Sequence, residues 1–230
     1  MRLGVLFSGG KDSTYALYKA MQKDAMQKYE VACLITIISE NPDSYMFHTP
    51  NINMTKLQAE AIGLPLVKQK TLGEKEKELA DLKKAISKAK DKYKIAGIVS
   101  GAFASKYQKE RIEKICDELS LQSITPLWAK NPEQLLHEMI RNGFKFMLSS
   151  IAALGLDEDW LGRILNEKDI DKLVEMNKKY GIHIAFEGGE AESLMIDGPL
   201  FKRKIKIIKA EKKMEDENTG IYRILKAELY

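Results

Sequence analysis

Residues 6–13 of the chain read LFSGGKDS, and this stretch decides how the first half of the protein folds. The apolar run at residues 2–7 has the length of a buried strand, and the Ser-Gly-Gly that follows it is a turn signal. From Ser13 onward, apolar residues recur at helical spacing. The chain therefore opens with a strand, a glycine turn and a helix, which is the first unit of an α/β sheet.

The same alternation continues as far as residue 127. Apolar runs typical of buried strands are followed by stretches with helical spacing. The predicted strands cover residues 31–38, 95–100 and 123–127, and the predicted helices cover residues 54–62, 74–94 and 112–119. Strands that alternate with helices predict right-handed crossovers and a parallel sheet with helices on both faces.

The pattern changes after Trp128. Helices are predicted over residues 132–142, 157–165 and 169–180, a strand over residues 144–151, and further strands of antiparallel type over residues 182–186, 194–196, 205–210 and 222–227. We therefore predict two domains, residues 1–127 and residues 128–230, of which the second is a smaller α+β domain.

The composition is that of an ordinary globular protein. Of 230 residues, 44% are hydrophobic and 30% are charged, and 37 basic residues stand against 33 acidic ones. An excess of four positive charges is too small to require a nucleic-acid partner. No apolar run approaches membrane-spanning length and no signal-peptide pattern precedes the first strand, so we expect a cytoplasmic protein without a membrane partner.

The loop at residues 8–13 predicts an anion site, although it matches neither common phosphate motif. A Walker A loop needs a glycine five residues before Gly-Lys and a Ser or Thr after it, whereas Val5 and Asp12 stand at these positions. The fingerprint GxGxxG fails because Gly9 and Gly10 are adjacent. Adjacent glycines nevertheless let main-chain N–H groups turn toward a ligand at the positive end of a helix.

The side chains of this loop fit the same interpretation. Ser8 and Ser13 supply hydroxyl donors, and Lys11 supplies a positive charge. Phosphate would repel Asp12 unless this residue holds a Mg²⁺ ion or caps the helix, so Asp12 is the candidate metal ligand. The alternative is a plain helix cap without a ligand, but such a cap needs neither two glycines nor the lysine.

With these residues, SGGKDS resembles the pyrophosphate loop of the N-type ATP pyrophosphatases, the PP-loop superfamily. The resemblance implies a Rossmann-like sheet of the HUP (adenine nucleotide alpha hydrolase-like) type. It also implies ATP as the cofactor, with the loop on its β- and γ-phosphates. In this superfamily a nucleophile attacks the α-phosphate, which yields an adenylated intermediate and releases pyrophosphate. The motif does not specify the substrate.

Further segments resemble one branch of this superfamily, the diphthine–ammonia ligases (diphthamide synthases), in its archaeal form. The matching segments are MFHTPN at residues 46–51, SGAF at residues 100–103 with Tyr107, Gln108 and Arg111, PLW at residues 126–128, EGGEAES at residues 187–193 and DGPLF at residues 197–201. The family pattern has tyrosine where Ala191 stands and threonine where Ser193 stands.

The resemblance implies an ATP-dependent amide ligase that acts on diphthine, a modified histidine of translation elongation factor 2. Diphthine carries a carboxylate and a trimethylammonium group. Adenylation converts a carboxylate oxygen, which is a poor leaving group, into AMP, and ammonia then forms the amide, diphthamide. The implied partners are elongation factor 2 and ammonium. No direct contact with nucleic acid is expected. The sequence does not decide whether the protein forms a homo-oligomer.

Three carboxylates, those of Glu187, Glu190 and Glu192, fall within six residues around Gly188 and Gly189. Carboxylates this close repel one another, so a cation should neutralise them or a pKa should rise. Ammonium, the trimethylammonium group or Mg²⁺ would each serve, and a carboxylate can also take a proton from ammonium. A solvated acidic turn is the alternative. We expect these five residues to act in catalysis and substrate binding.

Several nucleotide-site candidates lie elsewhere in the first half. Gly101, Tyr107 and Gln108 follow a strand at the sheet edge where α/β proteins bind ligands. Arg111 is the candidate for stabilising charge on the α-phosphate, with pairing to a glutamate as the alternative. His48 can contact the nucleotide, and a structural histidine before a helix is the alternative.

Two more candidates concern the substrate. The ring of Trp128 can hold a quaternary ammonium, although such tryptophans are more often interface core, which is the interpretation we favour for Trp160. Asp197 belongs to the second acidic segment and is expected at the substrate.

The cysteines bear on the source of nitrogen. Enzymes that take ammonia from glutamine need an exposed and activated cysteine nucleophile. Cys33 lies in an apolar run and Cys116 on the apolar face of a helix, so both are predicted to be buried and reduced. Free ammonium is therefore the predicted nitrogen source.

Two other functions are compatible with the opening loop. A tRNA-modifying enzyme of the same superfamily would adenylate a base, but such enzymes usually need catalytic cysteines, a metal-binding domain or a basic face. A sensor protein without chemistry would bind ATP on a similar fold, but it would leave the acidic segment unexplained.

Overall fold

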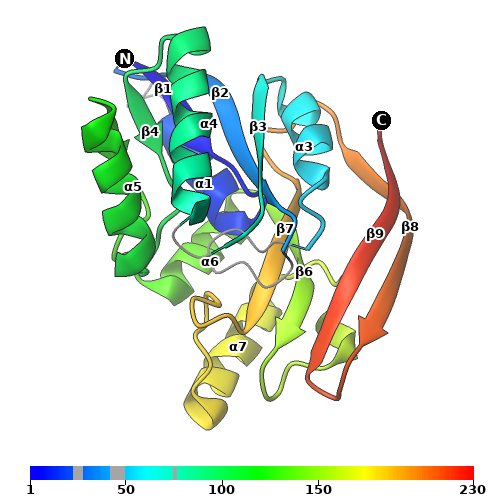
Figure 1. Cartoon of the computed structure of the whole chain (residues 1–230). Helices are drawn as coiled ribbons and strands as arrows, with labels where there is room; N and C mark the ends of the chain where they lie inside the picture. The colour runs from blue at the N-terminus through cyan, green and yellow to red at the C-terminus, as the bar shows by residue number, and fades with distance from the viewer. Residues whose placement is uncertain (23–27, 42–49, 75–76) are drawn as a thin grey trace. The chain divides into compact units, whose positions relative to one another are not determined.

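Figure 1 shows a computed structural model of the chain, which describes residues 1–22, 28–41, 50–74 and 77–230. The chain divides into two compact units, Met1–Trp128 and Ala129–Tyr230. Each unit contains its own sheet. Within the described ranges, no helix is both long enough and apolar enough to cross a bilayer.

The first unit contains a five-stranded sheet in the order β3-β2-β1-β4-β5. Its strands are β1 (Arg2–Leu6), β2 (Glu30–Ser39), β3 (Leu66–Thr71), β4 (Gly97–Val99) and β5 (Gln122–Ile124), and all pairs are parallel. The described helices are α1 (Lys11–Ala20), α3 (Met54–Ile62), α4 (Lys77–Tyr93) and α5 (Lys106–Glu118). This strand order is that of a Rossmann-like sheet, so the predicted α/β fold is confirmed.

Helices cover both faces of this sheet. Leu82 and Ile86 of α4 and Cys116 of α5 belong to one buried cluster with Ile35 of β2 and Ile98 of β4. Helix α1 lies on the opposite face, behind the sheet in Figure 1. With both faces covered, the loops at the carboxyl ends of the strands remain as the place where a ligand can meet the backbone.

Strand β3 was not expected from the sequence. It pairs only with β2 and therefore forms an edge of the sheet. Lys68 and Lys70 are exposed on it. An edge strand faces solvent over part of its surface and carries charged side chains, so it lacks the continuous apolar run of a central parallel strand.

The second unit contains an antiparallel sheet of four strands in the order β7-β6-β9-β8. The strands are β6 (Lys145–Ala152), β7 (Ala191–Asp197), β8 (Ile205–Met214) and β9 (Thr219–Leu229). The helices are α6 (Pro132–Arg141) and α7 (Glu167–Tyr180), and η1 (Glu158–Trp160) is a 3-10 turn. Asn131 and Asn166 begin the two helices as side-chain caps. The α+β character predicted for this half is therefore observed.

The predicted helix at residues 157–165 is wrong. A single 3-10 turn forms there, and Gly162 then takes a φ of +73°. Leu161 and Ile164 form isolated β-bridges to strand β6. The backbone of this segment therefore finds its hydrogen-bond partners on a neighbouring strand, and its apolar residues are buried without forming a helix.

Candidate functional site

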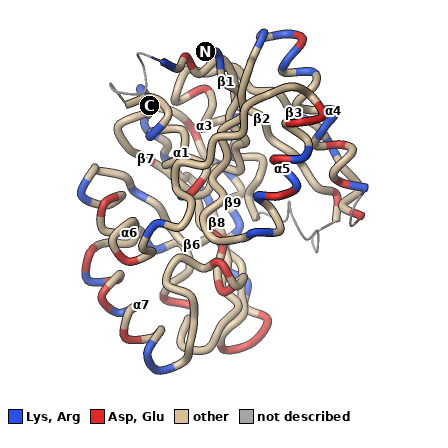
Figure 2. Tube along the Cα trace, turned by 90° about the vertical axis from the view of Figure 1, so that its left-hand side faces the viewer, with Lys and Arg blue, Asp and Glu red and all other residues tan. Residues whose placement is uncertain are grey.

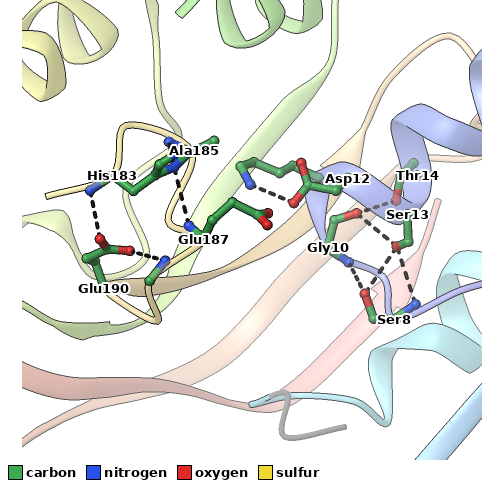
Figure 3. Close-up of polar contacts among 11 residues, drawn as sticks. Ser8, Gly10, Asp12, Ser13, Thr14, His183, Ala185, Glu187 and Glu190 are labelled. Atoms are coloured by element: carbon green, nitrogen blue, oxygen red, sulfur yellow. Dashed lines mark hydrogen bonds and ion pairs between the residues drawn. The ribbon is translucent and has the colours of Figure 1, made fainter. Parts of the chain in front are cut away.

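Two loops carry most of the candidate residues, and they belong to different units of the chain. The glycine loop comprises residues 8–13 and joins β1 to α1. The acidic loop comprises residues 182–192 and leads from α7 into β7. Figure 3 draws the polar contacts within each of them.

The glycine loop lies where the strand order of the first sheet reverses. Strand β1 has β2 on one side and β4 on the other, so the loops after β1 and β4 border the same crevice. Gly101 follows β4 and approaches the start of α1 closely. A Cβ atom on Gly101 would lie 2.7 Å from the backbone nitrogen of Ser13. A side chain at position 101 would therefore push the two loops apart.

Gly9 is required by its backbone conformation and by a neighbouring side chain. Its φ is +81°, in the left-handed region that favours glycine. The Nε2 group of Gln58, on α3, donates a hydrogen bond of 2.8 Å to the Gly9 carbonyl. A Cβ atom on Gly9 would lie 2.2 Å from Oε1 of Gln58. Gln58 thus supports the loop from 49 residues away, and no local motif in the sequence pointed to it.

The hydroxyl groups of the glycine loop bond within the loop (Figure 3). Ser13 Oγ donates to the Gly10 carbonyl at 3.2 Å and accepts the N–H of Ser8 at 3.3 Å. Thr14 Oγ1 donates to the same Gly10 carbonyl at 2.8 Å. Gly10 is the N-cap residue of α1, and no side chain caps the helix. Asp12 therefore does not cap the helix through its side chain, and the helix begins with main-chain N–H groups.

Lys11 and Asp12 form a partly buried ion pair. Nζ of Lys11 lies 2.6 Å from Oδ2 of Asp12, and the two side chains are 3% and 24% exposed. The other oxygen of Asp12, Oδ1, is buried and has no hydrogen-bond partner among the described residues. A buried oxygen in this state needs a partner, and carboxylate oxygens are ligands that Mg²⁺ prefers. The geometry of Asp12 therefore fits a bound Mg²⁺ ion.

Ser100 is a candidate that the sequence analysis did not single out. It follows β4 directly, its residue surface is 2% exposed, and its hydroxyl has no hydrogen-bond partner within the described part of the chain. A buried hydroxyl next to Gly101 is available to a ligand in the crevice. Ser100 begins the segment SGAF at residues 100–103, but the sequence does not show that its hydroxyl is buried without a partner.

Tyr107, Gln108 and Arg111 lie on α5. The guanidinium carbon of Arg111 is 3.3 Å from the centre of the Tyr107 ring. Ser105 caps the helix by accepting the N–H of Gln108 at 3.3 Å. A guanidinium stacked on a ring has a restricted orientation and presents its N–H groups in its own plane. Tyr107 thus orients Arg111.

The ring of Trp128 already has a cation over it. Nζ of Lys109 lies 5.2 Å from the centre of this ring and also pairs with Glu113 at 2.6 Å. Trp128 can take a trimethylammonium group on the same face only if Lys109 moves. Trp160 is 6% exposed, in agreement with a core residue. His48 lies outside the described residues.

Glu190 gives the acidic loop its shape, and the strand predicted at residues 182–186 is wrong for this reason. One carboxylate oxygen accepts the N–H of His183 at 2.7 Å, and the other accepts the N–H of Gly188 at 2.9 Å. Phe186 has a φ of +65°, which turns the chain back toward Glu190. Backbone N–H groups that a strand would donate to a neighbouring strand are satisfied inside the loop.

His183 was also missed by the sequence analysis. Its Nδ1 atom lies 3.2 Å from the N–H nitrogen of Ala185 and 3.4 Å from that of Glu187, and it accepts both hydrogen bonds (Figure 3). A ring nitrogen that accepts hydrogen bonds keeps its lone pair, so the neutral ring carries its proton on Nε2. A histidine that bonds to the backbone two and four residues later leaves no pattern in a sequence.

The three glutamates of the acidic loop differ in their surroundings. Glu190 is bonded to the backbone, whereas Glu187 lies in the turn and Glu192 belongs to β7, where it pairs with Ser150 of β6. Within the described ranges, no three His, Cys, Asp or Glu side chains are grouped so that they could hold a metal ion. The structure therefore gives no support to a single Mg²⁺ site made by all three carboxylates.

Asp197 ends strand β7 and has structural partners. Its Oδ2 atom lies 3.2 Å from Nζ of Lys145, on the neighbouring strand β6, and its Oδ1 atom accepts the N–H of Gly198 at 2.9 Å. Both oxygens are thus engaged within the sheet and the following turn.

Cys33 and Cys116 are both free and buried, as predicted. Burial is the main cause that raises the pKa of each thiol to about 11. A thiol with such a pKa is protonated at neutral pH and is a poor nucleophile. Neither cysteine has the exposed and activated setting that glutamine hydrolysis requires.

Matches to known proteins cover nearly the whole chain. The N-terminal domain of diphthamide synthase matches residues 1–123, and the C-terminal domain of diphthamide synthase matches residues 131–230. The diphthine–ammonia ligases of Mus musculus and Homo sapiens are each 36% identical to this chain over 230 residues, which is 92% of this chain and 84% of each relative.

Among solved structures, a protein from Methanocaldococcus jannaschii described as a predicted subunit of tRNA methyltransferase is a distant neighbour. It is 18% identical, with a TM-score of 0.44, and the match covers 86% of this chain and 98% of that one. A likeness this distant says nothing about function. The two domain matches and the relatives at 36% identity do decide the family. The chain belongs to the diphthamide synthase family.

Proposed function

We propose that this protein is a diphthine–ammonia ligase, which converts diphthine on translation elongation factor 2 to diphthamide with ATP and ammonium. The observation that carries this proposal is the match of both diphthamide synthase domains, at residues 1–123 and 131–230. The named relatives at 36% identity support the same reaction. We expect the protein to act in the cytoplasm, where translation takes place.

We assign ATP binding to the first unit. The uncapped start of α1 and the left-handed Gly9 favour main-chain N–H groups around the β- and γ-phosphates. Lys11 would exchange its pairing with Asp12 for a phosphate oxygen, and Asp12 would then hold Mg²⁺ through the oxygen that has no partner. Bound Mg²⁺ supplies positive charge that neutralises the phosphates. Ser100 and Arg111 are the further candidates in this unit.

The reaction proceeds in two displacements. A carboxylate oxygen of diphthine attacks the α-phosphorus, the bond from this phosphorus to the β-phosphate bridge breaks, and pyrophosphate leaves. Ammonia then attacks the acyl carbon, and AMP leaves with the original carboxylate oxygen. Charge develops on the α-phosphate in the first step, so a guanidinium oriented as that of Arg111 is suited to stabilise it.

We assign the nitrogen and the cationic substrate group to the acidic loop. Glu190 holds the loop through two backbone N–H groups, so its carboxylate acts as a positioning group. Glu187 and Glu192 are the carboxylates that we propose for attracting ammonium or the trimethylammonium group and for accepting the ammonium proton. The buried thiols leave free ammonium as the nitrogen source.

The test is a reconstituted reaction. The protein is incubated with ATP, Mg²⁺, ammonium and diphthine-bearing elongation factor 2. We expect AMP and pyrophosphate as products and a decrease of about one mass unit in the factor, because an acid becomes an amide. Replacing the factor by tRNA tests the tRNA-modifying alternative. Formation of ADP instead of AMP, or ATP binding without turnover on either substrate, would contradict the proposal.

A further inference from the structure

Strands β8 and β9 of the second sheet form a ribbon that extends beyond its pairing with β6. Strand β9 pairs with β6 only through Thr219, Gly220 and Ile221, whereas it pairs with β8 along nearly its whole length, from Gly220 to Leu229. Strand β8 is the edge strand of this sheet. Among the described residues, the strand pairing of the outer part of the ribbon is between β8 and β9 alone, and Figure 1 shows these two long strands running side by side.

The ribbon, together with the three basic residues that precede it, carries all of the net charge of the chain. Residues 202–230 contain nine of the 37 basic residues and five of the 33 acidic residues, an excess of four, and the whole chain has a net charge of +4. The remaining residues are balanced. Three of the five acidic residues, at positions 215–217, lie in the turn at the tip. The two strands and the segment that enters them are therefore strongly basic.

One face of the ribbon places two lysines directly opposite each other. Directly paired residues lie on the same face of a sheet, and the pairs on this face include Lys206 with Glu228 and Lys209 with Lys226. Like charges directly opposite each other destabilise a sheet. The pair of Lys209 and Lys226 therefore lowers stability, and both lysines are exposed.

Two exposed apolar side chains lie next to this lysine pair. The register of the ribbon shifts on both sides of Lys209, which leaves Ile208 on β8 and Leu225 on β9 without a direct partner across the strands. Ile208 is 43% exposed and Leu225 is 44% exposed. Bulges of this kind bend a ribbon and re-aim its side chains. The result is an apolar centre with lysines beside it.

We propose that this basic ribbon is the docking surface for the protein that carries diphthine, through an acidic patch on that protein. The inference rests on the proposed function, which requires a protein substrate. Apolar side chains at the centre and charges around them are typical of protein interfaces. The net charge of the whole chain is only +4, which is too small to require a nucleic-acid partner. Lysines on an edge strand also prevent aggregation, and that role alone predicts no effect on substrate affinity.

The test compares two triple variants of the whole protein. The ribbon variant carries Lys206→Glu, Lys209→Glu and Lys226→Glu. The control carries Lys168→Glu, Lys172→Glu and Lys178→Glu, which are exposed lysines of α7, so the change in net charge is the same. With saturating ATP and ammonium, we expect the ribbon variant to raise the KM for the diphthine-bearing factor about tenfold or more while kcat changes less than about twofold.

The dependence on salt and on substrate separates the possible outcomes. Raising the ionic strength should raise the KM for the diphthine-bearing factor in the wild type and in the control. In the ribbon variant the same change should raise this KM much less. An unchanged KM in the ribbon variant would overturn the docking proposal and leave the ligase proposal intact. A selective loss of RNA binding in a mobility-shift assay with tRNA, with KM unchanged, would assign the ribbon to nucleic acid instead.

Direct binding keeps the two proposals distinguishable. If the wild type forms no amide, the ligase proposal fails, and docking is then measured as the Kd of the elongation factor by sedimentation or calorimetry. An equal Kd for the wild type and the ribbon variant would overturn the docking proposal. Circular dichroism and thermal unfolding of both variants verify that the sheet is intact.

Discussion

The glycine loop and the acidic loop use their polar groups in opposite ways. In the glycine loop, serine and threonine hydroxyls bond within the loop, and the helix begins without a side-chain cap. In the acidic loop, the side chains of His183 and Glu190 take up the backbone N–H groups. The first loop is therefore suited to bind through its main chain, whereas the second is held in shape by the side chains of His183 and Glu190.

This difference predicts which substitutions are severe. A loop that binds through its main chain depends on a few charged groups that complete the site and on glycines that cannot be replaced. A loop that is held by side chains depends on hydrogen-bond acceptors, and part of their effect can be restored by a side chain with an acceptor at the same position.

Removing the ion pair of the glycine loop should have the largest effect. We expect Lys11→Ala and Asp12→Ala to abolish adenylation, with a loss of at least about 100-fold in AMP formation, because Lys11 and the Mg²⁺ ion that Asp12 would hold supply positive charge where negative charge develops. AMP and pyrophosphate are measured with ATP and the diphthine-bearing factor. Lys19→Ala, near the other end of the same helix, is the control and should retain activity. Full adenylation by Lys11→Ala would remove the glycine loop from the site.

Glu190→Ala should have the next largest effect and should act only on the second half of the reaction. Two backbone N–H groups lose a carboxylate acceptor, and each such bond contributes about 1.5–3 kcal/mol. We expect ATP affinity to change less than about twofold while diphthamide formation falls about 100-fold. Glu217→Ala, at the tip of the ribbon, serves as the control. An unchanged diphthamide yield with Glu190→Ala would remove the acidic loop from the site.

His183 offers a finer test of the same comparison. His183→Ala removes an acceptor from two backbone N–H groups, so we expect a loss of about 1–3 kcal/mol in stability and a reduced amide-forming rate. His183→Asn has an acceptor oxygen near the position of Nδ1 and should restore most of both, whereas His183→Gln should not. Thermal unfolding and single-turnover amide formation are measured together. Equal defects in all three variants would contradict the acceptor role of Nδ1.

Substituting the two cysteines should have the smallest effect on activity. Cys33→Ser and Cys116→Ser should leave the ammonium-dependent rate within about twofold, since no step uses a thiolate. The pKa of each thiol is raised from 9.0 to about 11, so each remains protonated until the pH rises through 11. At pH 8 the native protein should react with iodoacetamide about 100-fold more slowly than the unfolded chain. Fast alkylation of the native protein would contradict the buried setting.

The same pKa shifts predict a loss of stability at high pH. A thiol whose pKa is higher in the folded state than in the unfolded chain contributes stability that is fully present below pH 9. This contribution is lost as the pH rises from 9 through 11, because the unfolded chain ionises first. Urea titrations between pH 8 and 11 should show this decrease, and the double substitution of both cysteines by alanine should show a smaller one.

How much of the fold could be predicted from the sequence depends on where each segment finds its partners. Strand β1 and helix α1 were predicted because an apolar run, two glycines and a helical pattern are adjacent in the chain. Strand β3 was missed because an edge strand has no continuous apolar run. The segments at residues 157–165 and 182–186 were mispredicted because their backbones bond to β6 and to the side chain of Glu190.

The candidate site divides in the same way. The glycine loop, Gly101 and the acidic segment were recognised because each is a short motif of contiguous residues. Gln58, Ser100 and His183 were missed, because each acquires its role from a contact or a burial that only folding creates. The separate surroundings of Glu187, Glu190 and Glu192 could not be read from their spacing.

The sequence by itself determined the α/β class of the first half, the glycine loop and the identity of the acidic segment, because these depend on local periodicity and on contiguous motifs. Tertiary structure alone decided that Glu190 and His183 support a loop, that Lys11 is buried against Asp12, and that Lys209 and Lys226 lie opposite each other on an exposed ribbon. The physical reason is that burial, hydrogen-bond partners and strand register are set by residues far apart in the chain, which no local pattern records.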